Sequence, residues 1–166
     1  DKDKEKINTL KLGISPIYEP GLNELIKKNS KEGRLIFTND IKKAVSQSDL
    51  IFICVGTPTK KNSQEVNLSY IFKAVKEIAN STKKKKLIIT KSTVPVGTGD
   101  EIDNILKKYR RTNIDVISNP EFLREGEAIR DFRFPDRIVI GSNKIKYFKV
   151  IKKLYQPLIN KGAKFF

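Results

Sequence analysis

Two glutamates with an arginine between them form the group of side chains with the clearest potential for chemistry. Glu121 and Glu125 lie four residues apart, and Arg124 comes directly before the second of them. On a helix, residues at this spacing face the same way, and paired carboxylates are suited to general acid–base work. Arg124 would bind phosphate or order the two carboxylates. The spacing alone also fits a solvated helix start, where glutamate suits the helix dipole.

Hydroxyl side chains follow two apolar runs that are typical of strands. Thr57 lies in a Gly-Thr-Pro turn, where the glycine lets the backbone approach a ligand and the proline stiffens the exit. Ser92 and Thr93 follow Lys91 in a second turn, and their hydroxyls are able to hold a water, a phosphate or a hydroxylated substrate. Taken alone, the first turn also fits an ordinary strand end, and the second fits a turn that caps a helix.

Hydrophobic spacing along the chain alternates between the period of a strand and that of a helix. Apolar runs predict strands at residues 35–37, 50–55, 87–90, 114–117 and 137–141. Spacings of three and four predict helices at 3–12, from Pro20, from Asn39 or Asp40, from Asn67, and at 99–109, 121–130 and 144–157. The run at 50–55 is continuous, which is typical of a strand buried on both faces. We therefore predict an α/β fold with a doubly wound, mainly parallel sheet, in one domain over residues 1–166.

The carboxyl ends of parallel strands meet at one rim of such a sheet, and ligands bind beyond that rim. Thr57, Thr93 and Glu121 each follow a predicted strand, so we expect them to lie close together. Cys54 lies within a predicted strand, which favours a place in the core over a role as nucleophile. Asp136 and Arg137 are expected to form an exposed ion pair of little energetic weight.

The net charge of +15 favours anionic partners. Most of the 34 basic residues are lysines spread over nearly every predicted helix, and the densest run, Lys83–Lys86, falls where we expect a solvated turn. Nucleic-acid interfaces instead tend to cluster arginine and interleave aromatic side chains. We therefore expect no nucleic-acid partner, and keep a basic nucleic-acid-binding module as the alternative from another functional class.

The composition also limits the available chemistry. The chain has no histidine and one cysteine, so we expect no metal site and no internal disulfide. Acid–base steps must then use carboxylates, lysines, hydroxyls or water. We expect no membrane contact because the sequence has no apolar stretch of about 18 residues. A reducing cytoplasm suits the single thiol.

Several motifs, taken together and in order, carry a family resemblance over essentially all 166 residues. The chain resembles the N-terminal domain of the UDP-glucose/GDP-mannose dehydrogenases, and two of its segments, Pro16–Gly21 and Pro135–Gly141, favour the UDP-glucose branch. The other motifs are the turn Val55–Pro58 and the segments Lys91–Gly97 and Asn119–Gly126.

The resemblance implies a Rossmann-like sheet that binds NAD, and oxidation of UDP-glucose from alcohol to carboxylate in two steps. It assigns cofactor contacts to Asp1, Lys6, Thr57, Thr93 and Glu125, with Asp1 holding the adenosine ribose hydroxyls. It makes Glu121 the catalytic carboxylate of thioester hydrolysis and Thr93 the residue that orients the catalytic water. The sugar-nucleotide segment would comprise Glu121, Phe122, Leu123, Arg124 and Glu125.

The sequence departs from the family pattern at both ends. The glycine-rich phosphate loop, first strand and first helix of the family would precede Asp1, and its catalytic cysteine with lysine, asparagine and aspartate partners would follow Phe166. We therefore expect an NAD-binding fragment that is inactive alone, its sheet lacking the first strand and helix. The resemblance implies a homo-oligomeric full-length enzyme. Alternative substrates are GDP-mannose and a UDP-N-acetylhexosamine.

Overall fold

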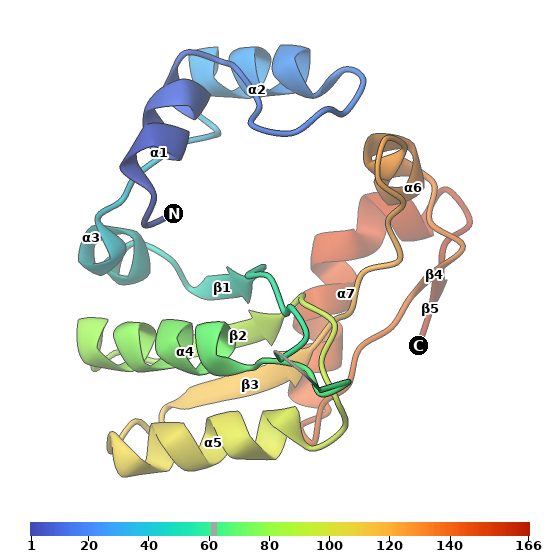
Figure 1. The fold of residues 1–166 in the computed structure, drawn as a ribbon. Coiled ribbons are helices and arrows are strands. Elements are labelled where there is room, and N and C mark those ends of the chain that lie inside the picture. Colours follow the sequence, from blue (N-terminus) through green and yellow to red (C-terminus); the bar gives the residue numbers. More distant parts are fainter. Residues whose placement is uncertain (61–62) are drawn as a thin grey trace.

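The computed structural model describes residues 1–60 and 63–166 as an alternation of helices and strands (Figure 1). In chain order the elements are α1 (Lys4–Lys11), α2 (Leu22–Lys31), α3 (Ile41–Ser46), β1 (Leu50–Ile53), α4 (Ser69–Ser81), β2 (Lys86–Thr90), α5 (Thr98–Lys108), β3 (Ile114–Ser118), α6 (Ala128–Arg133), β4 (Arg137–Ile138), α7 (Lys146–Ile159) and β5 (Lys164–Phe165). Most predicted helices are confirmed within a few residues. Gly13 adopts φ 78° just after α1, a backbone conformation that favours glycine at the end of a helix.

A three-stranded parallel sheet in the order β1-β2-β3 forms the centre of the fold, and its arrows point the same way in Figure 1. Leu50 pairs with Leu87 at one end of β1, and Ile53 pairs with Thr90 at the other. Thr90 in turn pairs with Ser118, the last residue of β3. The predicted parallel α/β architecture is confirmed, and the three strands end at the same level.

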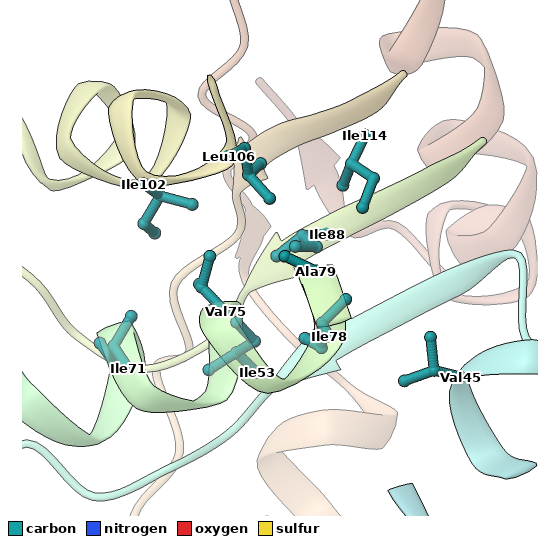
Figure 2. Packing of buried hydrophobic residues seen from close by; sticks show 10 residues of the cluster. All are labelled: Val45, Ile53, Ile71, Val75, Ile78, Ala79, Ile88, Ile102, Leu106 and Ile114. Carbon is teal, nitrogen blue, oxygen red and sulfur yellow. The ribbon is translucent and has the colours of Figure 1, made fainter. Parts of the chain in front are cut away.

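Helices α4 and α5 cover one face of this sheet because their apolar sides face the strands. Ile88 on β2 is fully buried there, together with Ile71 and Val75 of α4 and Ile102 of α5. Figure 2 shows ten side chains of this cluster gathered between the helices and the strands. This cluster anchors both crossover helices, and therefore fixes where the loops between strands begin.

Helix α7 covers the other face of the sheet. Leu87 and Ile89 alternate with Ile88 along β2, so they point to this opposite side and pack against Ile151 and Tyr155 of α7. Because β2 is covered on both faces, all five of its residues are buried.

Two buried polar contacts fasten α7 to β3. Asp115 on β3 accepts hydrogen bonds from Lys144 and Tyr147, and its carboxylate lies 3.5 Å from Lys146 Nζ. Near the other end of α7, Tyr155 Oη donates to Asn119 Oδ1 over 2.6 Å. Buried polar groups are costly without partners, so these contacts fix how α7 lies on the sheet.

The N-terminal strand predictions need correction. Residues 35–37 form no strand, and the Ile36 side chain is 80% exposed. The strand predicted at 50–55 ends at Ile53, and Phe52 is 38% exposed, so this strand is not buried on both faces. Within the described residues β1 pairs only with β2, which leaves its other edge and part of one face uncovered.

The C-terminal part of the chain and the lysine run also differ from the predictions. The strand predicted at 137–141 shortens to β4, which pairs in parallel with the unpredicted β5 in a separate two-stranded sheet. Gly141 instead forms an isolated antiparallel bridge with Ser118. Lys86 is not part of a solvated turn: only 4% of it is exposed, and its ammonium donates to the carbonyls of Ser46 and Ser48.

The Asp115 contacts predict a pH-dependent stability. Burial alone would raise the pKa of Asp115, but the hydrogen bonds from Lys144 and Tyr147 outweigh it and hold the pKa below its ordinary value of 3.8. A lowered folded-state pKa gives stability that is present above pH 3.8 and is lost as the pH falls through the folded value. Asp115→Asn should cost about 2 kcal/mol in urea unfolding at pH 7, and the gap to the parent should narrow below pH 4. A difference in unfolding free energy that stays constant across pH would contradict this. Asp100→Asn, at an exposed position of α5, is the control.

The Tyr155–Asn119 hydrogen bond predicts a second stability effect. Tyr155→Phe keeps the ring but leaves the buried Asn119 Oδ1 without its donor, so unfolding free energy should fall by about 1–2 kcal/mol. Chemical denaturation would measure the difference, with Tyr70→Phe as the control because Tyr70 is 46% exposed. An equal loss of unfolding free energy in the two variants would show that the buried hydroxyl of Tyr155 stabilises the fold no more than an exposed one does.

Candidate functional site

The loops after β1 and β2 are hydrogen-bonded to each other at the rim of the sheet. Thr57 Oγ1 donates to the carbonyl of Thr93 over 3.2 Å. The buried Ser92 hydroxyl donates to the carbonyl of Val55 over 2.6 Å, and the Lys91 amide donates to the carbonyl of Ile53 over 2.9 Å. These bonds continue the parallel pairing beyond the strands, so the two hydroxyl-bearing turns lie side by side.

The loop after β3 joins the same rim. The backbone N–H of Asn119 donates to the carbonyl of Thr90 over 2.9 Å, which extends the β2–β3 pairing by one residue. Lys91 Nζ then reaches across to the carbonyl of Pro120 over 3.4 Å. Thr57, Thr93 and Glu121 therefore follow three strands whose ends are held together, as expected from the sequence.

The segment that carries the two glutamates is a loop, which corrects the predicted helix at 121–130. Helix α6 begins only at Ala128, after Gly126 with φ 82°. The Asp131 carboxylate accepts from the Arg124 amide over 2.9 Å and from its guanidinium over 2.7 Å. A left-handed glycine and this contact hold the chain out of a helix, so Glu121 and Glu125 do not share a helical face.

Arg124 does not order Glu121 and Glu125 as predicted, because its carboxylate partners are Glu127 at 2.7 Å and Asp131 at 2.7 Å. Hydrogen bonds from Arg124 lower the pKa of Asp131 to about 2. The same bonds raise the pKa of Arg124, so the guanidinium is a fixed positive charge within its own loop.

A cavity of about 480 Å³ lies between this loop, α6 and α7. None of the ion pairs among the described residues joins Arg137 to Asp136, which corrects that expectation. The guanidinium carbon of Arg137 instead lies 4.3 Å from the centre of the Phe122 ring. A stacked arginine of this kind presents positive charge to a cavity of polar and apolar character. The other relevant lining residues are Lys91, Asn119, Glu121, Leu123, Arg124 and Tyr155.

A larger groove of about 980 Å³ runs along the uncovered edge of β1. Asp1 and Lys6 lie at one part of it, with their charged atoms 3.8 Å apart, and Cys54 and Gly56 lie where β1 ends. A Cβ atom added at Gly56 would meet nothing within 4 Å, so the backbone is open to a close approach there. This groove therefore links Asp1 and Lys6 to the rim.

Four titratable side chains lie together behind the rim. Cys54 is exposed at the end of β1, which corrects its predicted place in the core. Although the residue as a whole is exposed, neighbouring atoms partly desolvate its thiol; this desolvation, and then the charge of Glu121, raise the pKa of the Cys54 thiol, whereas Lys91 lowers it. Burial lowers the pKa of Lys91 against the opposing effect of Glu121. Burial and then Cys54 raise the pKa of Tyr155, whose ring centre lies 6.0 Å from Lys91 Nζ.

The structure separates the residues predicted from the sequence into several places. Thr57 and Thr93 are joined at the rim and line neither the cavity nor the groove. Glu121, Phe122, Leu123 and Arg124 line the cavity, whereas Asp1 and Lys6 lie along the groove. Glu125 is exposed and lines neither cavity nor groove. Sequence reasoning missed Tyr155, because a tyrosine on the apolar side of a helix gives no signal that separates it from the core.

The loop before α2 contacts helix α6, which follows the segment that carries Glu121 and Glu125. Glu19 Oε1 accepts a hydrogen bond from the Ile129 amide at the start of α6 over 3.0 Å. Segments 110 residues apart are thereby joined beside the site. None of the helices in the described residues is both long and apolar enough to span a membrane.

Known proteins with similar sequences are dehydrogenases. The chain is 48% identical over 161 residues to the UDP-glucose 6-dehydrogenase of Rhizobium meliloti, covering 95% of this chain and 37% of that protein. It is 49% identical over 159 residues to the UDP-glucose 6-dehydrogenase TuaD of Bacillus subtilis, covering 95% of this chain and 34% of the relative. The chain therefore spans a little over a third of the length of these curated relatives.

Solved structures agree with this grouping. A ternary complex of GDP-mannose dehydrogenase from Pseudomonas aeruginosa superposes with a TM-score of 0.93 at 36% identity, covering 100% of this chain and 39% of the other. A UDP-glucose dehydrogenase from Pyrobaculum islandicum gives a TM-score of 0.91 at 32% identity, over 99% and 38% of the two chains. The model of the UDP-glucose/GDP-mannose dehydrogenase family, NAD binding domain, matches residues 1–159, and this chain belongs to that family.

Proposed function

We propose that this chain is the NAD-binding part of an enzyme that oxidises UDP-glucose to UDP-glucuronate. The observation that carries the proposal is that the loops bearing Thr57, Thr93 and Glu121 are held together at one rim, where a parallel sheet binds ligands. Curated relatives at 42–49% identity bear the name UDP-glucose 6-dehydrogenase, which favours UDP-glucose as the substrate. GDP-mannose is the second candidate, because the GDP-mannose dehydrogenase structure superposes over the whole chain.

The groove along β1 fits a dinucleotide in size and in chemistry. Its volume of about 980 Å³ lies at the upper end of the range for ligand pockets. In the proposal, Asp1 binds the ribose hydroxyls of NAD, and Lys6 contacts the cofactor next to Asp1. Thr57 and Thr93 contact the part of NAD nearest the rim. Bound NAD would supply a hydride acceptor. Thr57 and Thr93 lie outside the groove lining but follow the strand ends beside it, whereas Glu125 is an exposed loop residue and is the least supported cofactor contact.

The cavity beside the rim is the proposed place for the sugar nucleotide. Four of the five residues in segment 121–125 line it, and the positive charge of Arg137 suits a diphosphate, whereas Arg124 is paired with Glu127 and Asp131. Glu121 would act as the catalytic carboxylate that takes a proton from water during hydrolysis of the acyl intermediate, with Thr93 orienting that water. Support for these roles comes from the strand ends, since the loops that carry Thr93 and Glu121 follow the neighbouring strands β2 and β3 and are joined through Lys91 and Pro120.

The wider setting belongs to the same proposal. Residues 1–166 would form one partial NAD-binding domain of a homo-oligomeric enzyme, and the free Cys54 thiol suits a reducing cytoplasm. A nucleic-acid-binding role has less support, since Lys86 is buried and Lys91 faces Pro120 rather than open solvent.

Glu121→Gln tests the proposal in the full-length enzyme that carries this chain. Removing a catalytic carboxylate should lower kcat with UDP-glucose by about 100-fold or more, while the NAD dissociation constant stays close to the parent value. Steady-state kinetics and calorimetric titration of NAD would measure the two quantities. Glu101→Gln on the exposed side of α5 is the matched control and should change neither. Equal losses of turnover and NAD affinity in Glu121→Gln would contradict the role.

A further inference from the structure

Lys91 occupies a constrained position between the three strand ends. Its amide donates to the carbonyl of Ile53 after β1, and its ammonium donates over 3.4 Å to the carbonyl of Pro120 after β3. The ammonium also lies 6.0 Å from the ring centre of Tyr155 on α7. The backbone and the side chain of this one residue therefore connect the ends of β1, β2 and β3 with α7.

Glu121 follows Pro120 directly, so Lys91 holds the backbone from which the proposed catalytic carboxylate projects. Lys91 and Glu121 also line the same cavity. We propose that Lys91 is a positioning residue for Glu121, which fixes the preceding carbonyl and places a compensating positive charge beside the carboxylate. The inference rests on the proposed function for its purpose, but its geometry stands without it.

The chemistry of the cavity gives a reason for this charge. An anionic sugar diphosphate would enter a cavity that the Glu121 carboxylate also lines, and the two negative charges would repel each other. The half-buried Lys91 ammonium lines the same cavity, so its positive charge offsets that repulsion and leaves the carboxylate available to accept a proton. Arg124 serves this purpose less well, because Glu127 and Asp131 already engage it.

The alternative is that Lys91 is a purely structural residue. Its contacts with the Pro120 carbonyl and the Tyr155 ring would then stabilise the loop without affecting the charge around Glu121. A loss of stability in a Lys91 variant would not separate these two possibilities. A measurement that responds to the local charge is needed.

Cys54 provides such a measurement because it is the single cysteine of the chain. The charged and titratable groups that act on its thiol are Glu121, Lys91 and Tyr155. Glu121 raises the pKa of the thiol and Lys91 lowers it, and alkylation proceeds through the thiolate. The rate of iodoacetamide alkylation of the 166-residue chain, measured as a function of pH, therefore reports whether the charges of Lys91 and Glu121 both act on the Cys54 thiol.

Four variants make the test specific. Lys91→Met removes the positive charge and should raise the thiol pKa, so that the smaller thiolate fraction slows alkylation at pH 7.5 about threefold. Lys91→Arg keeps the charge and should behave like the parent. Glu121→Gln removes the negative charge, so it should lower the thiol pKa and speed alkylation. Lys108→Met, on the exposed side of α5, is the control and should have no effect.

An unchanged thiol pKa in folded Lys91→Met, or a Lys91→Arg variant that matches Lys91→Met, would overturn the proposal. If circular dichroism shows Lys91→Met to be unfolded, Glu121→Gln decides the question, and an unchanged thiol pKa in that variant would overturn it. The titration needs neither NAD nor a sugar nucleotide. Its failure is therefore distinguishable from failure of the proposed enzymatic function, which the kinetics of Glu121→Gln test separately.

Discussion

Parallel hydrogen bonding of β2 with both its neighbours is the constraint on which the rest of this structure depends. Because Ile53, Thr90 and Ser118 lie at one level, the backbone that follows each strand continues the pairing, through the Lys91 amide on one side and the Asn119 amide on the other. The loops are thereby fixed to one another before any ligand binds. Pre-fixed loops of this kind avoid the entropic cost of ordering on binding.

The fold follows from local patterns wherever an element packs along its whole length. The apolar residues 87–90 predict a buried strand, and burial of β2 on both faces explains why the prediction holds. Residues 35–37 are similarly apolar but have no partner strand in the described part of the chain, so their apolar character alone gives a wrong prediction. Strand β5 has two residues and depends on its pairing with β4, which gives no detectable sequence signal.

The site is only partly visible in the sequence because several of its contacts join distant segments. The order of the strands allows the meeting of Thr57, Thr93 and Glu121 to be predicted, since it requires only a parallel sheet. The loop conformation around Arg124 depends on Asp131, and the surroundings of Lys91 depend on Tyr155, 64 residues further along the chain on α7. Side-chain contacts of this kind cannot be derived from periodicity or spacing.

Nuclear Overhauser measurements on the isotope-labelled chain would examine the shared rim most directly. The structure predicts through-space contacts between Thr57 and Thr93 and between the Lys91 side chain and Pro120, in the same sample that shows the β1–β2 and β2–β3 pairings. Intact strand pairings without either of these contacts would show that the loops diverge, and would contradict a single binding rim.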